Sequence, residues 1–439
     1  MWRQLLAERP DDPRSLGAIA FIHDKLDRTA EARELWRTLV DRFPTKSPYW
    51  ISYGLNLRAA GLTEEAVSAL RRAVTVDPER GEAWWGLASI KSYTISDEDI
   101  VTMKEALETA TDVVNLSPLH FALGRAFQGR KQHEAAFHHF SEANRLWAEA
   151  IKYNAEELTK EVAEARTTFD RGYFNRLEPD GASSDAPVFL VSLPRSGSTL
   201  LEQMLGTHPD IEPLGELPYI PALMRSVMER ATQRKRVTVP QVLAEFSPAD
   251  RKALGEEYLR RAAVHRRSDS SRFIDKLPHN WNNILFIKHI LPNARFIDIR
   301  RTPVACCFAN FSHSFTRAHS SSFSLDHIGR AYRDYLRLME HLDEAAPGMV
   351  HHLRYEELID QPEDNLRRVL DYLALPWDDS VLRFYEADRA VRTPSAEQVR
   401  RPLNREGIGA WKPYRQWLGP LIEALGPLAD QELAEADRA

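Results

Sequence analysis

The stretch PVFLVSLPRSGSTLLEQMLGTHPDI, residues 187–211, carries the local pattern that decides the fold. Val188 to Leu193 predict a short buried strand, and Thr199 to Leu205 begin an apolar helical pattern. A strand, a glycine-containing loop and a helix in this order aim free backbone N–H groups at an anion. The loop would add polar side chains to those amides: Arg195, Ser196, Ser198 and Thr199.

This loop differs from the phosphate loop of nucleoside triphosphatases. It lacks the Gly-Lys-Ser/Thr ending that such loops carry. No clear apolar strand ends in a magnesium-binding aspartate; Asp298 in RFIDIRR comes nearest, and basic residues follow it immediately. The pattern therefore argues against ATP or GTP as the ligand. Taken alone, it is equally compatible with an ordinary strand-to-helix turn.

A second stretch, RFIDKLPHNWNNILFIKHILPNARFIDIRR, predicts a strand, a loop, a helix and another strand. Phe273 to Asp275 lead into Lys276, and Arg295 to Ile299 lead into Arg300 and Arg301. Such βαβ units form parallel sheets, whose ligands lie at the carboxyl ends of the strands. The loop of Arg195, together with Lys276 and Arg301, should therefore converge at one edge of the sheet. Three cations and a helix N-terminus in one place require a polyanion.

From about Pro187 to about Leu425 the chain resembles the sulfotransferases, especially the protein-tyrosine sulfotransferase type. The resemblance implies a P-loop-like α/β domain with a central parallel sheet and 3′-phosphoadenosine 5′-phosphosulfate as donor. In that family the loop Pro-Arg-Ser-Gly-Ser/Thr-Thr grips the phosphosulfate. Those contacts carry over to Arg195, Ser196, Gly197, Ser198 and Thr199.

The resemblance also implies roles for residues outside the loop. Lys276 corresponds to the lysine that stabilises the bridging oxygen, and Arg301 to the arginine on the 3′-phosphate. Glu216, in THPDIEPLGEL, falls where the family places its catalytic base. With Lys276 and Arg195 it would form the catalytic set, while His279 is a rival base because other sulfotransferases use histidine. Positioned cations suffice to stabilise the leaving group, so no metal is expected.

The chain departs from the family pattern at one position that would contact the donor. The family usually has a serine on the 3′-phosphate eight residues after the arginine, and this chain has Ala309 there, with Ser312 and Ser314 nearby. Losing one hydrogen bond to a phosphate would weaken donor binding by about 1–3 kcal/mol.

The segment RTPSAEQVRRPLNREGIGAWKPY resembles the one that folds over the donor. It contributes three candidate donor contacts: Ser395, Arg401 and Lys412.

The first third of the chain repeats with a period of 34 residues. Pro44 and Pro78 are 34 apart, as are Trp50 and Trp84. This period is similar to that of the tetratricopeptide repeat, and residues 47–78 form the clearest unit. The predicted organisation is an α-helical repeat solenoid over residues 1–150, a helical connector and linker over 151–186, and the sulfotransferase domain over 187–439. The repeats would hold a peptide or protein acceptor, or serve as a structural appendage that dimerises the chain.

The composition of the 439 residues limits the other function classes. A net charge of −6 offers no general basic field for nucleic acid. The two cysteines, Cys306 and Cys307, are too few for a disulfide framework and fit a reducing compartment. Neither a secretory signal nor an apolar stretch of about 18 residues is found, so we expect a cytoplasmic protein without membrane association.

The predicted reaction is sulfuryl transfer to an acceptor hydroxyl, with protein tyrosine favoured. A small-molecule or saccharide hydroxyl is the alternative acceptor. A different class of function is a repeat-based interaction scaffold with an inactive donor-binding domain, and Ala309 is the feature that favours it.

Overall fold

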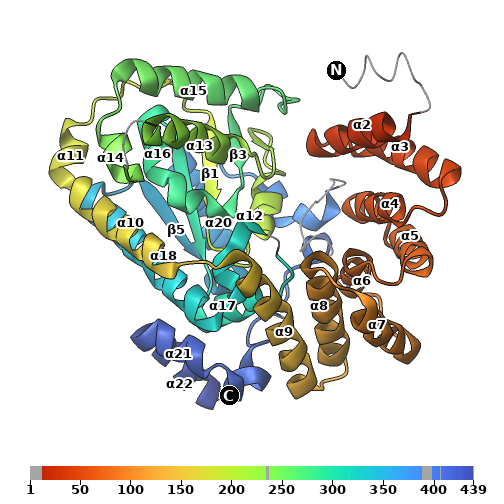
Figure 1. Cartoon of the computed structure of the whole chain (residues 1–439). Helices are drawn as coiled ribbons and strands as arrows, with labels where there is room; N and C mark the ends of the chain where they lie inside the picture. The colour runs from red at the N-terminus through yellow and green to blue at the C-terminus, as the bar shows by residue number, and fades with distance from the viewer. Residues whose placement is uncertain (1–11, 234–236, 316, 388–397, 406, 439) are drawn as a thin grey trace.

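The computed structural model describes residues 12–233, 237–315, 317–387, 398–405 and 407–438. Within these residues an N-terminal series of helices lies along one side of a sheet-containing part (Figure 1). None of the described helices combines the length and apolar composition needed to cross a membrane.

The N-terminal region is built of α-helices, of which α2 and α3, α4 and α5, and α8 and α9 pack as consecutive pairs. Its helices are α2 Pro13–Lys25, α3 Thr29–Arg42, α4 Ser47–Ala59, α5 Thr63–Val76, α6 Gly81–Ala88, α7 Asp97–Thr109, α8 Val113–Gly129 and α9 His133–Ile151. Helices α2, α4 and α6 begin at residues 13, 47 and 81, and α3, α5 and α7 begin at 29, 63 and 97. These starting positions thus recur every 34 residues, whereas α8 and α9 begin 32 and 36 residues after α6 and α7.

The period is also visible in side-chain contacts. The indole N–H of Trp50 donates to the carbonyl of Pro44 at 2.9 Å, and that of Trp84 donates to the carbonyl of Pro78 at 2.8 Å. Both contacts tie a helix to the turn before it. The sequence prediction of a helical N-terminal region is therefore confirmed.

The second part has a five-stranded sheet in the order β2-β3-β1-β4-β5, and every pair of neighbours is parallel. The strands are β1 Pro187–Val191, β2 Ile211–Pro213, β3 Arg272–Asp275, β4 Arg295–Arg300 and β5 Val350–Arg354. The predicted strands are confirmed to within two residues. β1 lies between β3 and β4, so the connection from β3 through α16, Ile284–Ile290, to β4 crosses over β1.

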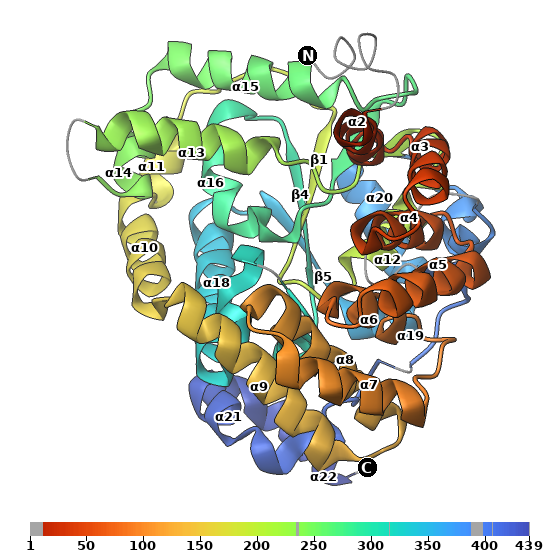
Figure 2. The same cartoon turned by 45° about the vertical axis from the view of Figure 1, so that its right-hand side comes forward.

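β1 is buried along its whole length because helices cover both faces of the sheet (Figures 1 and 2). Val188 and Leu190 pack in one core, together with α12 Ser198–Leu205 and α20 Pro362–Leu373. Phe189 and Val191 pack in the other. The remaining helices of this part are α13 Tyr219–Thr232, α14 Val239–Ala244, α15 Pro248–Ala262, α17 Pro303–Phe311, α18 Leu325–Ala345, α19 Tyr355–Asp360, α21 Gly419–Leu425 and α22 Asp430–Arg438.

Residues 151–186 contain α10, Ala155–Thr168, and α11, Arg171–Arg176, and pack on the sheet-containing part. The Thr159 hydroxyl donates to Asp334 at 2.6 Å. The amide of Ala182 donates to the carbonyl of Ile290 at 2.9 Å.

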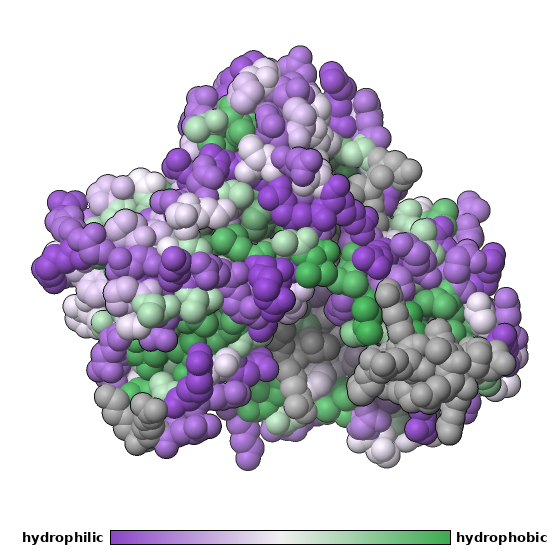
Figure 3. Space-filling model, turned by 90° about the horizontal axis from the view of Figure 1, so that it is seen from above, coloured by the Kyte–Doolittle hydropathy of each residue, from purple (hydrophilic) through white to green (hydrophobic). Residues whose placement is uncertain are grey.

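The N-terminal helices dock on the sheet-containing part as well. Asn144 of α9 donates to the carbonyl of Phe311 at 2.7 Å, and the rings of Trp85 and His313 lie 5.1 Å apart. Seen from above, the molecule has a hollow between its projecting parts, bordered by hydrophobic and polar side chains (Figure 3). The N-terminal helices and the sheet-containing part are thus in direct contact with each other.

Candidate active site

A cavity of about 620 Å³ lies at the carboxyl ends of β1, β3 and β4. Its wall includes the loop after β1, the residues after β3 and β4, several of the described residues between Val399 and Trp411, and three residues of the N-terminal region. Six of the lining side chains are basic and one, Glu216, is acidic. The basic ones are Lys91, Arg125, Arg195, Lys276, Arg301 and Arg401. This excess of positive charge suits a polyanionic ligand.

The loop between β1 and α12 depends on left-handed backbone conformations. Arg195 has φ +66° and Gly197 has φ +96°. A Cβ atom on Gly197 would lie 2.4 Å from the Tyr355 ring, so glycine is required by conformation and by space. Gly197 is the N-cap of α12, and Ser198 and Thr199 of the first turn line the cavity. The loop therefore faces the cavity with the N-terminal end of a helix, as the sequence predicts.

Ser196 departs from the predicted arrangement. It is buried, its hydroxyl lies 3.3 Å from the thiol of Cys306, and it does not line the cavity. The residues on either side, Arg195 and Gly197, both have left-handed backbone conformations. The Ser196 hydroxyl thus lies against Cys306 and outside the cavity lining, and the predicted donor contact of Ser196 stays a prediction.

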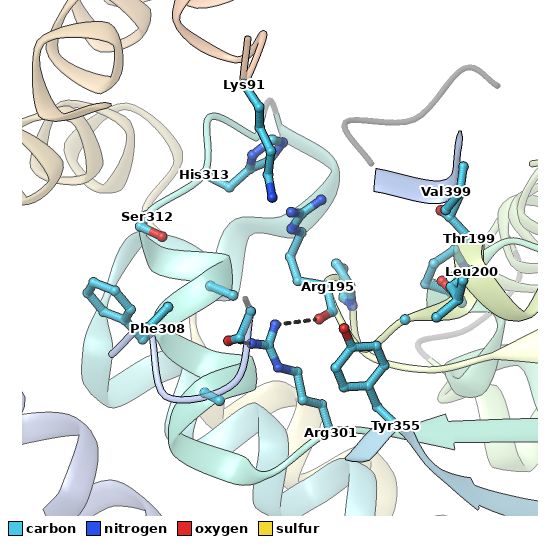
Figure 4. A pocket seen from close by; sticks show the side chains of 18 of the residues that line it. Lys91, Arg195, Thr199, Leu200, Arg301, Phe308, Ser312, His313, Tyr355 and Val399 are labelled. Carbon is cyan, nitrogen blue, oxygen red and sulfur yellow. Dashed lines mark hydrogen bonds between the residues drawn. The ribbon is translucent and has the colours of Figure 1, made fainter. Parts of the chain in front are cut away.

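Arg301 and Arg195 both line the cavity, and the Arg301 side chain points at the backbone of Arg195 (Figure 4). Arg301 donates to the carbonyl of Arg195 at 3.1 Å and also to the carbonyl of Gly407, and its guanidinium lies over the ring of Tyr355. Burial lowers the pKa of Arg195 to about 10, with further contributions from the charges of Arg125 and Arg301. The positive charges of Arg125 and Arg301 act unfavourably on that of Arg195, and an anion bound among them would offset this repulsion.

Lys276 joins the end of β3 to the segment that carries Glu216. Its side chain is 1% exposed, and its Nζ lies 2.7 Å from Glu216 Oε1 and 3.9 Å from Glu202 Oε2. The Glu216 side chain is 50% exposed and lines the cavity. Glu202 of α12 also accepts from the amide of Gly215 at 3.0 Å. The predicted lysine and the predicted base are thus brought together by one ion pair.

His279, the alternative candidate for the catalytic base, lies outside the lining of the cavity. His313 and His319, by contrast, line the cavity. Burial lowers the pKa of His319 to about 4. Burial and the charges of Arg195 and Arg125 hold the pKa of His313 well below its ordinary value. Both cavity histidines are therefore neutral near pH 7. The sequence analysis did not single them out, because the stretch FSHSFTRAH, residues 311–319, has no spacing that marks a site.

The C-terminal segment contributes some of the predicted contacts. Arg401 lines the cavity, while Ser395 lies outside the described residues. Lys412 is exposed and does not line the cavity; its neighbour Trp411 does. Trp411 is buried, and successive side chains at the start of a 3₁₀ turn point in directions about 120° apart. Lys412 thus stands apart from the cavity wall in this structure, and its donor contact stays a prediction.

Ala309, Ser312 and Ser314 all line the cavity. Asp298 does not, since it is fully buried and is bound by Arg300, His352 and Tyr335. Among the described residues no group of three or more His, Cys, Asp or Glu side chains is placed to hold a metal ion.

Residues 187–379, less than half of the chain, match the family model described as "Sulfotransferase family". The chain is 31% identical over 402 residues to an "Uncharacterized protein" of Aquifex aeolicus, a match that covers 90% of this chain and 52% of that protein. It is 28% identical over 252 residues to "Protein-tyrosine sulfotransferase 1" of Danio rerio, covering 52% of this chain and 66% of that protein. The chain thus spans less than two thirds of the length of these relatives.

A solved structure, "Sulfotransferase Domain from the Curacin Biosynthetic Pathway", matches 57% of this chain and 98% of its own, with 18% identity and a TM-score of 0.40.

Proposed function

We propose that this protein is a sulfotransferase that uses 3′-phosphoadenosine 5′-phosphosulfate as donor and a protein tyrosine as the favoured acceptor. The observation that carries the proposal is the convergence of Arg195, Lys276 and Arg301 in one cavity. They follow β1, β3 and β4, which are adjacent in the sheet. Ligands of open parallel sheets bind at this edge.

The proposed reaction is an in-line displacement at sulfur. A bond forms between the acceptor oxygen and sulfur, and the bond from sulfur to the 5′-phosphate oxygen breaks. The electron pair leaves with that oxygen, where Lys276, Arg195 and the loop amides stabilise the developing charge. Glu216 accepts the proton of the acceptor hydroxyl. Glu216 is suited to this task because it is half-exposed in the cavity while Lys276 fixes its position.

Several observations favour tyrosine over the other acceptors. Relatives of this chain include proteins named protein-tyrosine sulfotransferase from several animals, at 22–28% identity. The helices of the N-terminal region also border the cavity through Lys91, Arg125 and Gln128. We propose that these helices are tetratricopeptide repeats, on the basis of their 34-residue period, and that they hold the peptide acceptor.

Transfer of label from radiolabelled donor tests the proposal. Full-length protein would be incubated with tyrosine peptides, small phenols or saccharides. We expect label on the tyrosine peptides, with loss of transfer in Lys276→Met. Lys252→Met serves as the matched control, because Lys252 lies exposed on α15. Transfer to phenols or saccharides alone would overturn the tyrosine assignment. Absence of both transfer and binding of 3′-phosphoadenosine 5′-phosphate would overturn the enzyme and favour the scaffold.

A further inference from the structure

Arg125 belongs to the N-terminal helices, yet its side chain lines the cavity of the sulfotransferase domain. It donates to Gln128 Oε1 at 2.7 Å, and its guanidinium lies over the rings of Trp85 and Phe140 at 5.8 and 5.9 Å. No ion pair among the described residues involves Arg125. Amide and aromatic contacts hold the side chain in place but leave its charge without a counter-ion.

The neighbours of Arg125 lie against both ends of the segment 308–313. The ring of Trp85 lies 5.1 Å from that of His313. At the other end, the ring of Tyr414 lies 4.5 Å from that of Phe308. Tyr414 and Arg125 are close enough to interact electrostatically. Arg125 therefore faces the cavity next to the turn of α17 that carries Ala309.

Ala309 presents a methyl group where the family resemblance implies a hydroxyl, and the nearby lining hydroxyls are those of Ser312 and Ser314. Ala309, Arg301 and Arg125 line the same cavity. A guanidinium offers up to five N–H donors in a planar fork and binds phosphate in a bidentate manner. One arginine at this wall would more than replace a single neutral hydroxyl.

We propose that Arg125 binds the 3′-phosphate of the donor nucleotide opposite Arg301, in place of the missing hydroxyl at position 309. The N-terminal helical region is then part of the donor site, in addition to any role in holding the acceptor. This inference rests on the proposed function, since it takes Arg301 as a 3′-phosphate contact.

Calorimetric titration of full-length protein with two nucleotides tests the inference. These are 3′-phosphoadenosine 5′-phosphate and adenosine 5′-phosphate, which lacks the 3′-phosphate. We expect Arg125→Gln to weaken binding of the first by about 10- to 100-fold, the range for charged hydrogen bonds, and of the second by less than about twofold. Arg125→Lys keeps the charge and the aliphatic stem, and should retain more affinity than the glutamine variant. Arg145→Gln is the control, because Arg145 lies on α9 and pairs with Glu142 and Glu149.

A rescue variant separates a phosphate contact from a packing role. Adding Ala309→Ser to Arg125→Gln should recover part of the lost affinity for the bisphosphate and leave binding of adenosine 5′-phosphate unchanged. Equal weakening of both nucleotides, or an unchanged affinity for the bisphosphate, would overturn the inference while the proposed function stands. Failure of the unmodified protein to bind the bisphosphate would overturn the proposed function, and this inference with it.

Discussion

The ammonium group of Lys276 and the carboxylate of Glu216 lie 2.7 Å apart, although 60 residues separate them in the chain. Lys276 follows β3, and Glu216 follows β2, the strand next to β3. The amide of Lys276 donates to the carbonyl of Gly215 at 2.9 Å, which extends the pairing of the two strands as far as the ion pair. Strand pairing thus places the candidate base beside the candidate leaving-group cation.

We expect Glu216→Gln to lower kcat by about 10²- to 10⁴-fold, the usual contribution of a general base, with a smaller change in the donor KM. Steady-state kinetics with the best acceptor of the labelled-donor assay would measure the change. His279→Ala is the comparison variant and should stay within a few-fold of the unmodified enzyme, because His279 does not line the cavity. Near-normal turnover of Glu216→Gln would exclude Glu216 as the base.

Gly197→Ala should both destabilise the protein and weaken donor binding. The added methyl group meets the Tyr355 ring at 2.4 Å in a backbone with φ +96°, and strain of this kind costs about 1–3 kcal/mol. Gly215→Ala is a matched control, since Gly215 has φ +70° but nothing within 4 Å of the added carbon. Chemical denaturation and titration with 3′-phosphoadenosine 5′-phosphate would measure both effects. Equal losses in the two variants would show that the ring contact is unimportant.

Replacement by asparagine should change the stability of the protein in opposite directions at two buried aspartates, Asp275 and Asp298. Burial raises the pKa of Asp275 from 3.8 to about 8, so this carboxyl is protonated in the folded protein near pH 7. The unfolded chain loses that proton at lower pH, so the contribution of Asp275 to stability falls as the pH rises from about 4 to about 8. Asp275→Asn removes this dependence and keeps an acceptor for the hydroxyl of Tyr258.

Asp298 is also buried, which raises its pKa, but Arg300 and hydrogen bonds from His352 and Tyr335 outweigh burial and lower it. Its charge stabilises the fold above the pKa of the unfolded chain, and Asp298→Asn should destabilise the protein by about 3–5 kcal/mol near pH 7. Thermal unfolding between pH 5 and about pH 8 would compare the variants. We expect the Tm advantage of Asp275→Asn over the unmodified protein to grow across that range. A constant difference would contradict the assignment of a protonated Asp275.

Glu432 holds the helix that carries Ala309. Its carboxylate accepts from the Thr302 hydroxyl at 2.9 Å and from the amides of Val304 and Ala305 at 2.7 and 3.1 Å, at the N-terminus of α17. Glu432→Ala should destabilise the protein by about 1–3 kcal/mol, because buried N–H groups lose their acceptor. Glu435→Ala is the control on the same helix, since Glu435 is exposed and bonds to Gln431. Denaturant unfolding would measure the difference, and equal stability of the two variants would refute a capping role.

The strands, the anion-binding loop and their order along the chain could be predicted from the sequence. β1 is a continuous apolar run because both of its faces are covered, and such a run is visible without knowing what covers it. The positions of Arg195, Lys276 and Arg301 followed from the same reasoning, because a residue directly after a parallel strand must lie at its carboxyl end. Periodicity likewise predicted the N-terminal helices, since a 34-residue repeat is a property of the sequence itself.

The tertiary structure alone decided which side chains enter the cavity. Arg125 reaches it only because the N-terminal helices dock on the sheet-containing part, with Asn144 of α9 bound to the end of α17. Ser196 and Lys412 do not line it, although a neighbour of each does. The crossover that leaves β1 between β3 and β4 is likewise absent from any local pattern. The physical reason is the range of the interactions. Strand and helix formation depends on neighbours a few residues away, whereas the direction of a side chain toward a shared cavity depends on contacts between segments that have no fixed spacing in the sequence.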